Sequence, residues 1–187
     1  MVKSKCKNLL SETKMSNNET VGVEIERKYI IEMPDVKILT MQEKYEKSEI
    51  LQTYLYSLRG ETRRVRRRCT DGVTRYIETR KLRIDNMSST EIERELEADE
   101  YRALLADADK DSTPIEKTRH IFIYEGQLFE IDVYPQWKET AIMETELKSR
   151  TETVAMPPFI KILKEVTGDK TYSNAGMSRH FPDEIKK

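Results

Sequence analysis

From Val21 onward the chain is dominated by apolar and charged residues that alternate with a period of two. Such alternation is typical of β-strands whose two faces have different surroundings. It predicts eight strands, over residues 21–31, 49–57, 62–68, 73–84, 91–97, 115–124, 127–134 and 141–148. Asp71-Gly72 and Gly126 separate consecutive strand segments and predict tight turns. The sequence therefore predicts an antiparallel, mainly β architecture.

Three stretches predict helices packed on that sheet. Residues 34–48 begin at a proline, which is tolerated in a first helical turn, and are rich in Lys and Glu. Residues 98–109 space their apolar side chains as a helix does, and residues 157–168 end at a glycine that suits a helix terminus. The chain after Lys170 is predicted to be mostly irregular.

The domain organisation predicted from these patterns has three parts. Residues 1–20 are polar and form an N-terminal extension, either a mobile lead or a partly helical arm. Residues 21–178 form one domain, and residues 179–187 form a polar C-terminal tail. A chain of 187 residues is the usual size for a single domain.

Composition narrows the classes of function. The 33 Lys and Arg residues and 34 Asp and Glu residues nearly cancel. The pI near 6.2 argues against a protein that coats a polyanion by bulk charge. No apolar run reaches the roughly 18 residues of a membrane span, which favours a soluble cytoplasmic protein without a membrane partner. Cys6 and Cys69 lie far apart, form no CxxC motif and are expected to be unpaired thiols.

The charges become informative when they are sorted by strand face. Successive strands carry like charges at positions i and i+2, as in Glu24 and Glu26, Arg64 and Arg66, or Glu144 and Glu146. A solvated outer face explains any one of these strands. It explains the whole set poorly, because like charges so close together repel unless something compensates them.

A closed barrel with these faces turned inward would supply that compensation. Eight strands enclose a space wide enough for side chains or one small ligand. Its cations would attract a compact polyanion: Lys28, Arg64, Arg66, Lys81, Lys117 and Arg119. The interleaved carboxylates would form salt bridges with these cations unless metal ions were present. Glu24, Glu26, Glu144 and Glu146 are hard oxygen ligands suited to Mg²⁺ or Mn²⁺. The combination fits a metal-bound polyphosphate.

At these residues the sequence resembles the CYTH domain, also called the triphosphate tunnel metalloenzyme superfamily. Glu24-Ile25-Glu26-Arg27-Lys28 is similar to the ExExK motif of that family. Further segments follow in the family's order: 52–55, 64–66, 79–81, 93–96, 117–119, 131–133, 144–146 and 172–174. A lone ExExK is weak evidence, whereas the ordered set over residues 21–178 is specific.

The resemblance implies an α+β, mainly β fold with an eight-stranded antiparallel closed barrel, a charged interior and about three or more packed helices. It implies a hydrolase, dependent on Mg²⁺ or Mn²⁺, that acts on a triphosphate-bearing small molecule. Carried over by motif position, the expected metal ligands are Glu24, Glu26, Glu144 and Glu146, with Asp132 as a further candidate. The expected phosphate ligands are Lys28, Arg64, Arg66, Lys81, Lys117 and Arg119. Glu93, Glu95 and Asp132 are candidates for ligating a second metal or for orienting the basic residues. Glu93 and Glu95 are also candidates for polarising water, so the expected catalytic set is Glu24, Glu26, Lys28, Glu93 and Glu95.

Several alternatives stay open at this point. Inorganic triphosphatase, which converts tripolyphosphate to pyrophosphate and phosphate, is preferred over a class IV-type adenylate cyclase, a thiamine triphosphatase and a non-catalytic polyphosphate sensor. The chain is also compatible with a homodimer. Nucleic-acid binding through the arginine-rich run Arg63–Arg68 is a further alternative. It is disfavoured because the run lies within an alternating strand, whose side chains point to two different faces. Extra arginines also leave room for a one-residue slip that would turn Arg64 and Arg66 outward.

Overall fold

The computed structural model describes residues 13–15 and 19–185. Its strands are β1 Thr13–Met15, β2 Glu19–Glu32, β3 Glu43–Leu55, β4 Glu61–Thr70, β5 Val73–Arg83, β6 Ser88–Leu96, β7 Ile115–Tyr124, β8 Gln127–Val133, β9 Thr140–Glu146 and β10 Ile162–Glu165. The helices are α1 Val36–Thr40, α2 Ala98–Leu104 and α3 Asn174–Arg179, with 3₁₀ turns at Leu105–Asp107 and Lys170–Tyr172. None of the described helices is long and apolar enough to cross a membrane.

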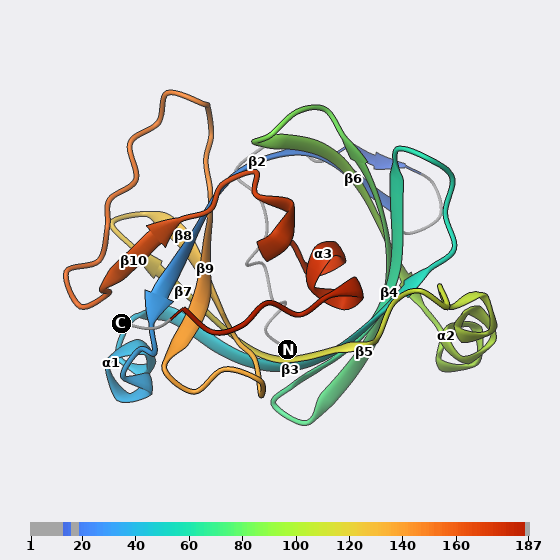
Figure 1. The fold of residues 1–187 in the computed structure, drawn as a ribbon, viewed down its shortest axis with the longest axis horizontal. Helices are drawn as coiled ribbons and strands as arrows, with labels where there is room; N and C mark the ends of the chain where they lie inside the picture. The colour runs from blue at the N-terminus through green and yellow to red at the C-terminus, as the bar shows by residue number, and fades with distance from the viewer. Residues whose placement is uncertain (1–12, 16–18, 186–187) are drawn as a thin grey trace.

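Strands β2 to β9 close into an antiparallel barrel, visible end-on in Figure 1. The strand order is β2-β6-β5-β4-β3-β7-β8-β9, and β9 pairs back with β2. The first half of β2 pairs with β6 and its second half with β9, so that Glu26 lies opposite Glu146. All eight strands predicted from the alternation are confirmed, as is the closed, mainly β barrel.

The hairpin turns follow from residues that tolerate a left-handed backbone. Asp71 and Gly72 have φ of 50° and 77° between β4 and β5. Glu125 and Gly126 have φ of 48° and 76° between β7 and β8. Two consecutive positive φ values match the twist of the flanking strands, which fixes the register of both hairpins.

Apolar side chains on the outside of the barrel form two cores. One contains Tyr29, Phe122 and Phe129 and is covered by Leu39 of α1 and by Phe159. The other joins Leu55 and Val65 to Tyr101 of α2. Because successive side chains of a strand point to opposite faces, and the apolar ones pack on the outside of the barrel, the charged ones point into the interior.

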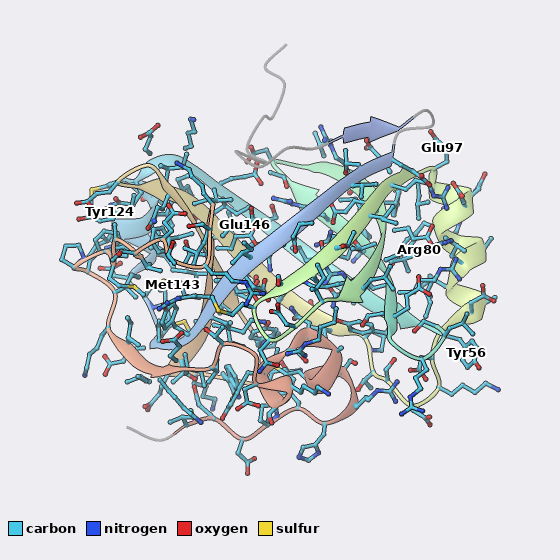
Figure 2. All side chains as sticks on the ribbon, turned by 90° about the horizontal axis from the view of Figure 1, so that it is seen from above. Tyr56, Arg80, Glu97, Tyr124, Met143 and Glu146 are labelled. Carbon is cyan, nitrogen blue, oxygen red and sulfur yellow. The ribbon has the colours of Figure 1, made fainter. Side chains whose placement is uncertain are left out.

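Helix α3 covers one end of the barrel. Figure 1 looks along the barrel and shows α3 within the ring of strands, and Figure 2, turned by 90°, shows it at one end. Met177 of α3 packs against Tyr54, Ile115 and Ile142, which share strand faces with the charged interior residues. The barrel therefore has one apolar, closed end.

One of the three helix predictions is wrong, and another is confirmed over only part of its length. In the stretch 34–48, only Val36–Thr40 is helical and β3 already begins at Glu43. In the stretch 157–168, Ile162–Glu165 forms a strand, β10, which pairs with residues 29–31 in the second half of β2. The helix predicted over 98–109 is confirmed as α2 followed by a 3₁₀ turn.

The two ends of the chain also differ from the expectation. Thr13–Met15 forms β1 on β2, so part of the N-terminal extension is a strand and not a helical arm, and residues 1–12 lie outside the described part. The region after Lys170 is ordered as a 3₁₀ turn and α3. Cys69 is a free thiol, as predicted, while Cys6 lies outside the described residues.

Candidate active site

The predicted inward-facing residues meet inside the barrel. The arginine run on β4 divides between two faces: Arg63 bonds Glu78 on the outside, whereas Arg64 and Arg66 reach Glu91 and Glu93 across β5. The register is therefore the predicted one, without a slip. A run split in this way forms no continuous basic patch for nucleic acid.

The most deeply buried ionic cluster centres on Asp132 of β8. Its two carboxylate oxygens accept hydrogen bonds from Arg119 Nε at 2.6 Å and Arg119 Nη2 at 2.7 Å. Lys117 Nζ donates to the same carboxylate at 2.6 Å, and both Lys117 and Asp132 side chains are only 1% exposed. Asp132 is thus occupied in orienting two cations, the second of the roles considered for it, which argues against its use as a metal ligand.

Lys28 of β2 lies beside that cluster and links it to β9. Its Nζ is 2.7 Å from Glu144 Oε1 and 4.0 Å from Glu26 Oε1. The other Glu144 oxygen accepts from Arg119 Nη2 at 3.4 Å. Glu144 therefore bridges two phosphate-ligand candidates.

A second cluster joins β2, β4, β5 and β6. Lys81 Nζ lies 3.0 Å from Glu91 Oε1 and 3.3 Å from Glu24 Oε2. Arg64 Nη2 lies 3.5 Å from the same Glu91 oxygen. Glu91 is buried and shared by two cations, so it holds them at a fixed separation.

A third contact set holds Arg66. Arg66 donates to Glu93 and, at 3.1 Å, to Thr79 Oγ1, and Thr79 in turn donates to Glu93 at 3.1 Å. The Nε atoms of both Arg66 and Arg64 are buried and have no hydrogen-bond acceptor within the described chain. Unpaired buried donors are costly, and an anion in the barrel would satisfy them.

All six predicted phosphate ligands are thus inside the barrel, each contacting a carboxylate. Of the two catalytic candidates on β6, Glu93 contacts Arg66, whereas Glu95 is exposed. Sequence reasoning did not select Glu91, Glu130 or Asn174, which contact Arg64, Arg119 and Lys117 respectively. The alternation had already placed Glu91 and Glu130 on the charged faces. The signal that would have selected them is that buried cations on neighbouring strands need carboxylates opposite them.

The charge balance differs between the two parts of the interior. Burial alone would raise the pKa of Glu144, but Lys28 and Arg119 outweigh it and lower that pKa to about 2. Burial and the neighbouring Arg119 lower the pKa of the Lys117 ammonium to about 8 despite Asp132. The Lys117 ammonium therefore loses its proton more readily than an exposed lysine would.

Negative charge is in excess around Glu24. Burial raises its pKa to about 8, helped by the carboxylates of Glu91, Glu146 and Glu26 and opposed by Lys81. Within the described residues no group of three or more His, Cys, Asp or Glu side chains is arranged to hold a metal ion. The donor chemistry nevertheless fits a hard divalent cation, since crowded carboxylates with surplus negative charge are what Mg²⁺ or Mn²⁺ would neutralise.

Stability should fall with rising pH because of Glu24. Its pKa is higher in the folded chain than in the unfolded one, so its contribution is fully present below about pH 4.5 and is lost as the pH rises toward about 8. We expect the free energy of unfolding in urea and a chelator to decline by roughly 1–3 kcal/mol more in the wild type than in Glu24→Gln between pH 5 and 8. Glu95→Gln, which alters an exposed carboxylate on the same barrel, should follow the wild type; parallel curves for wild type and Glu24→Gln would contradict the assignment.

Solved structures share this architecture. The inorganic triphosphatase NE1496 superposes with a TM-score of 0.55 and 26% identity, over 86% of this chain and 97% of that one. The PH1819 protein from Pyrococcus horikoshii OT3 superposes with a TM-score of 0.54 and 20% identity, over 68% of this chain and 80% of that one. The chain has the CYTH tunnel fold. No protein-family model and no curated protein matches the sequence. The resemblance to that family therefore rests on the ordered motifs, the closed barrel and these structures.

Two further ring side chains, His120 and Trp137, are buried in the wall and at the closed end of the barrel. His120 is buried on the outer face of β7, where its Nδ1 and the Tyr45 hydroxyl lie 2.9 Å apart. Trp137 is buried at the closed end against Tyr134. Neither lies among the interior charges.

Proposed function

We propose that this chain is a divalent-metal-dependent triphosphatase that hydrolyses inorganic tripolyphosphate to pyrophosphate and orthophosphate. The observation that carries the proposal is the set of buried cations inside the barrel. Among them, the Nε atoms of Arg64 and Arg66 have no hydrogen-bond acceptor within the described residues. A short polyphosphate presents anionic oxygens along its length and would satisfy them. The similarity to a protein described as an inorganic triphosphatase supports the same reaction.

The interior cations would bind the phosphate chain and neutralise its charge. Arg64, Arg66 and Arg119 present planar guanidinium forks, which suit two oxygens of one phosphate group. Lys28, Lys81 and Lys117 supply point charges between them. Phosphoryl transfer asks a protein mainly for such positioning and charge neutralisation. The carboxylates Asp132, Glu91 and Glu93 would keep these cations in place.

Glu24, Glu26 and Glu146 would hold the metal ion, with Glu144 at the edge of this group. When bound, Mg²⁺ or Mn²⁺ would supply a water of lowered pKa and neutralise charge on the terminal phosphate. In the reaction, the oxygen of water bonds to the terminal phosphorus, the bridging P–O bond breaks, and pyrophosphate leaves with the bonding electrons, while the proton lost by the water passes to the leaving pyrophosphate or to the solvent. The cations near Lys117 and Arg119 would stabilise the charge that develops on the leaving group.

The closed end of the barrel favours hydrolysis of an inorganic chain over cyclisation of ATP. Tyr54, Ile115 and Ile142 fill the interior there together with Met177. A nucleoside would have to extend from the opposite end. A cytoplasmic location would provide both the polyphosphate and the divalent metal.

The substrate can be tested by incubating the protein with tripolyphosphate, ATP or thiamine triphosphate, each with Mg²⁺, Mn²⁺ or a chelator. We expect orthophosphate and pyrophosphate in equal amounts from tripolyphosphate, and none in the chelator. Chromatography resolves these products from cyclic AMP. Cyclic AMP as the main product would instead support the cyclase, and tight tripolyphosphate binding without products would support a sensor.

A further inference from the structure

The carboxylate of Glu184 is bound by the loop that precedes β9. Its Oε1 accepts hydrogen bonds from the backbone N–H groups of Lys138 at 2.9 Å, Glu139 at 2.6 Å and Thr140 at 2.8 Å. The Thr140 hydroxyl donates to the same oxygen at 3.0 Å. Successive N–H groups that converge in this way form an anion-binding nest, and here a side chain of the same chain fills it.

The residues just before Glu184 lie against the closed end of the barrel. Phe181 packs edge-on against Trp137 and Tyr134, with ring centroids 5.4 Å and 5.5 Å apart. Trp137 Nε1 donates to the carbonyl oxygen of Pro182 at 3.1 Å. Residues 181–184 thus form a strap, fastened at Glu184, that follows directly from α3.

Helix α3 connects the strap to the ionic interior. Asn174, at its first turn, accepts a hydrogen bond from the Tyr134 hydroxyl at 3.0 Å. The same Asn174 oxygen lies 3.4 Å from Lys117 Nζ, inside donor range. Lys117 has Asp132 as its other hydrogen-bond partner, so Asn174 sets the second direction in which the ammonium group points.

We propose that Glu184 is a positioning residue that clasps the strap to the loop at 138–140 and thereby holds Asn174 in contact with Lys117. This proposal rests on the proposed function, and it gives Glu184, a residue outside the barrel, an indirect role in binding the phosphate chain. Without the clasp, α3 shifts, Lys117 loses one of its two partners, and its charge is less well placed for a phosphate oxygen.

The clasp itself is tested by the fluorescence of Trp137, the single tryptophan of the sequence. Glu184→Ala should raise the acrylamide quenching constant of Trp137 about two-fold or more, because a released strap uncovers the buried indole. Glu184→Gln should give a quenching constant between those of the wild type and Glu184→Ala, because its amide oxygen still accepts hydrogen bonds from backbone N–H groups. Asp183→Ala removes the neighbouring, exposed carboxylate and should quench like the wild type. Unchanged quenching in folded Glu184→Ala would overturn the clasp.

The coupling to Lys117 is tested by tripolyphosphate affinity, measured by calorimetry in a chelator, and by steady-state kinetics. Glu184→Ala and Asn174→Ala should each weaken binding and raise KM about three- to ten-fold, with kcat within about two-fold. The double variant should be no weaker than the weaker single variant, because both act through one contact. Effects that multiply, or a fall in kcat alone, would overturn the coupling.

These experiments separate the clasp from the proposed function. If the wild type binds tripolyphosphate but releases no product, the triphosphatase assignment fails, while the calorimetric comparison still decides the coupling. If the wild type binds tripolyphosphate neither in the chelator nor with Mg²⁺ or Mn²⁺, both the assignment and the coupling are wrong. The quenching result decides the clasp in either case.

Discussion

Replacing Glu26 by Gln is expected to lower metal-dependent tripolyphosphate hydrolysis by at least about 100-fold while the barrel stays folded, and Glu24→Gln should do the same. Both side chains come from β2 and lie among carboxylates whose surplus negative charge a divalent cation would neutralise. The amide keeps the shape of the side chain but removes the charge that the metal requires. Phosphate release over a Mg²⁺ or Mn²⁺ titration measures the loss.

The matched control for these variants is Glu49→Gln. Glu49 is exposed on β3, on the strand face opposite Ile50 and Gln52, so its amide variant should keep wild-type turnover. Circular dichroism and thermal unfolding would establish that the Glu24 and Glu26 variants retain the fold. Full activity in either of them, in the presence of either metal, would refute their assignment as metal ligands.

Asp132→Asn should cost about 3–5 kcal/mol of unfolding free energy, the largest stability effect expected inside the barrel. The substitution leaves Lys117 and Arg119 buried while removing the charge that both contact, at 2.6 Å each. Burial opposes the charge of Arg119, but Asp132 and Glu130 keep its pKa above its usual value in the wild type, and Glu130 still contacts the guanidinium in the variant. Urea unfolding at neutral pH measures the change.

Asp99→Asn provides the comparison at the surface. Asp99 also pairs with an arginine, Arg102 on α2, but its side chain is 91% exposed. Exposed pairs of this kind contribute about 0–1 kcal/mol, so this variant should remain close to the wild type. A loss below about 1 kcal/mol in Asp132→Asn would show that the two buried cations find other partners, and that Asp132 does not hold them.

The barrel could be predicted from the sequence because each strand alternates between apolar residues on the face that packs outside and charged residues on the face that lines the interior. The charged faces could be recognised from like charges at i and i+2, and the six cations and Glu144 lie where that pattern puts them. The start of β3 is not evident from the sequence, because Glu43–Ser48 is mostly polar and its pairing with β7 is irregular between Glu43 and Glu46, so that the alternation is interrupted there. Residues 157–168 contain a strand that is set by pairing with β2, a contact that local sequence does not encode.

The finer geometry of the site could not be predicted from strand faces alone. Alternation assigns Glu91 to the interior but does not say that it lies between Lys81 and Arg64, because that depends on the stagger of three strands. The same limit applies to Asn174, which reaches Lys117 from a helix 57 residues further along the chain. Contacts of this kind follow from closure of the barrel and not from local pattern.

The double pairing of β2 has a consequence for the order of folding. Glu26 and Glu146 face each other across the seam that closes the barrel, although 120 residues separate them in the chain. Contacts between such distant segments form slowly, because a long loop must close first. The carboxylate group on β2 and β9 is thus assembled only when the last seam closes. A partly folded chain would contain the arginine hairpin β4–β5 but no metal-binding group, so a divalent cation should slow opening of the finished barrel without speeding its formation.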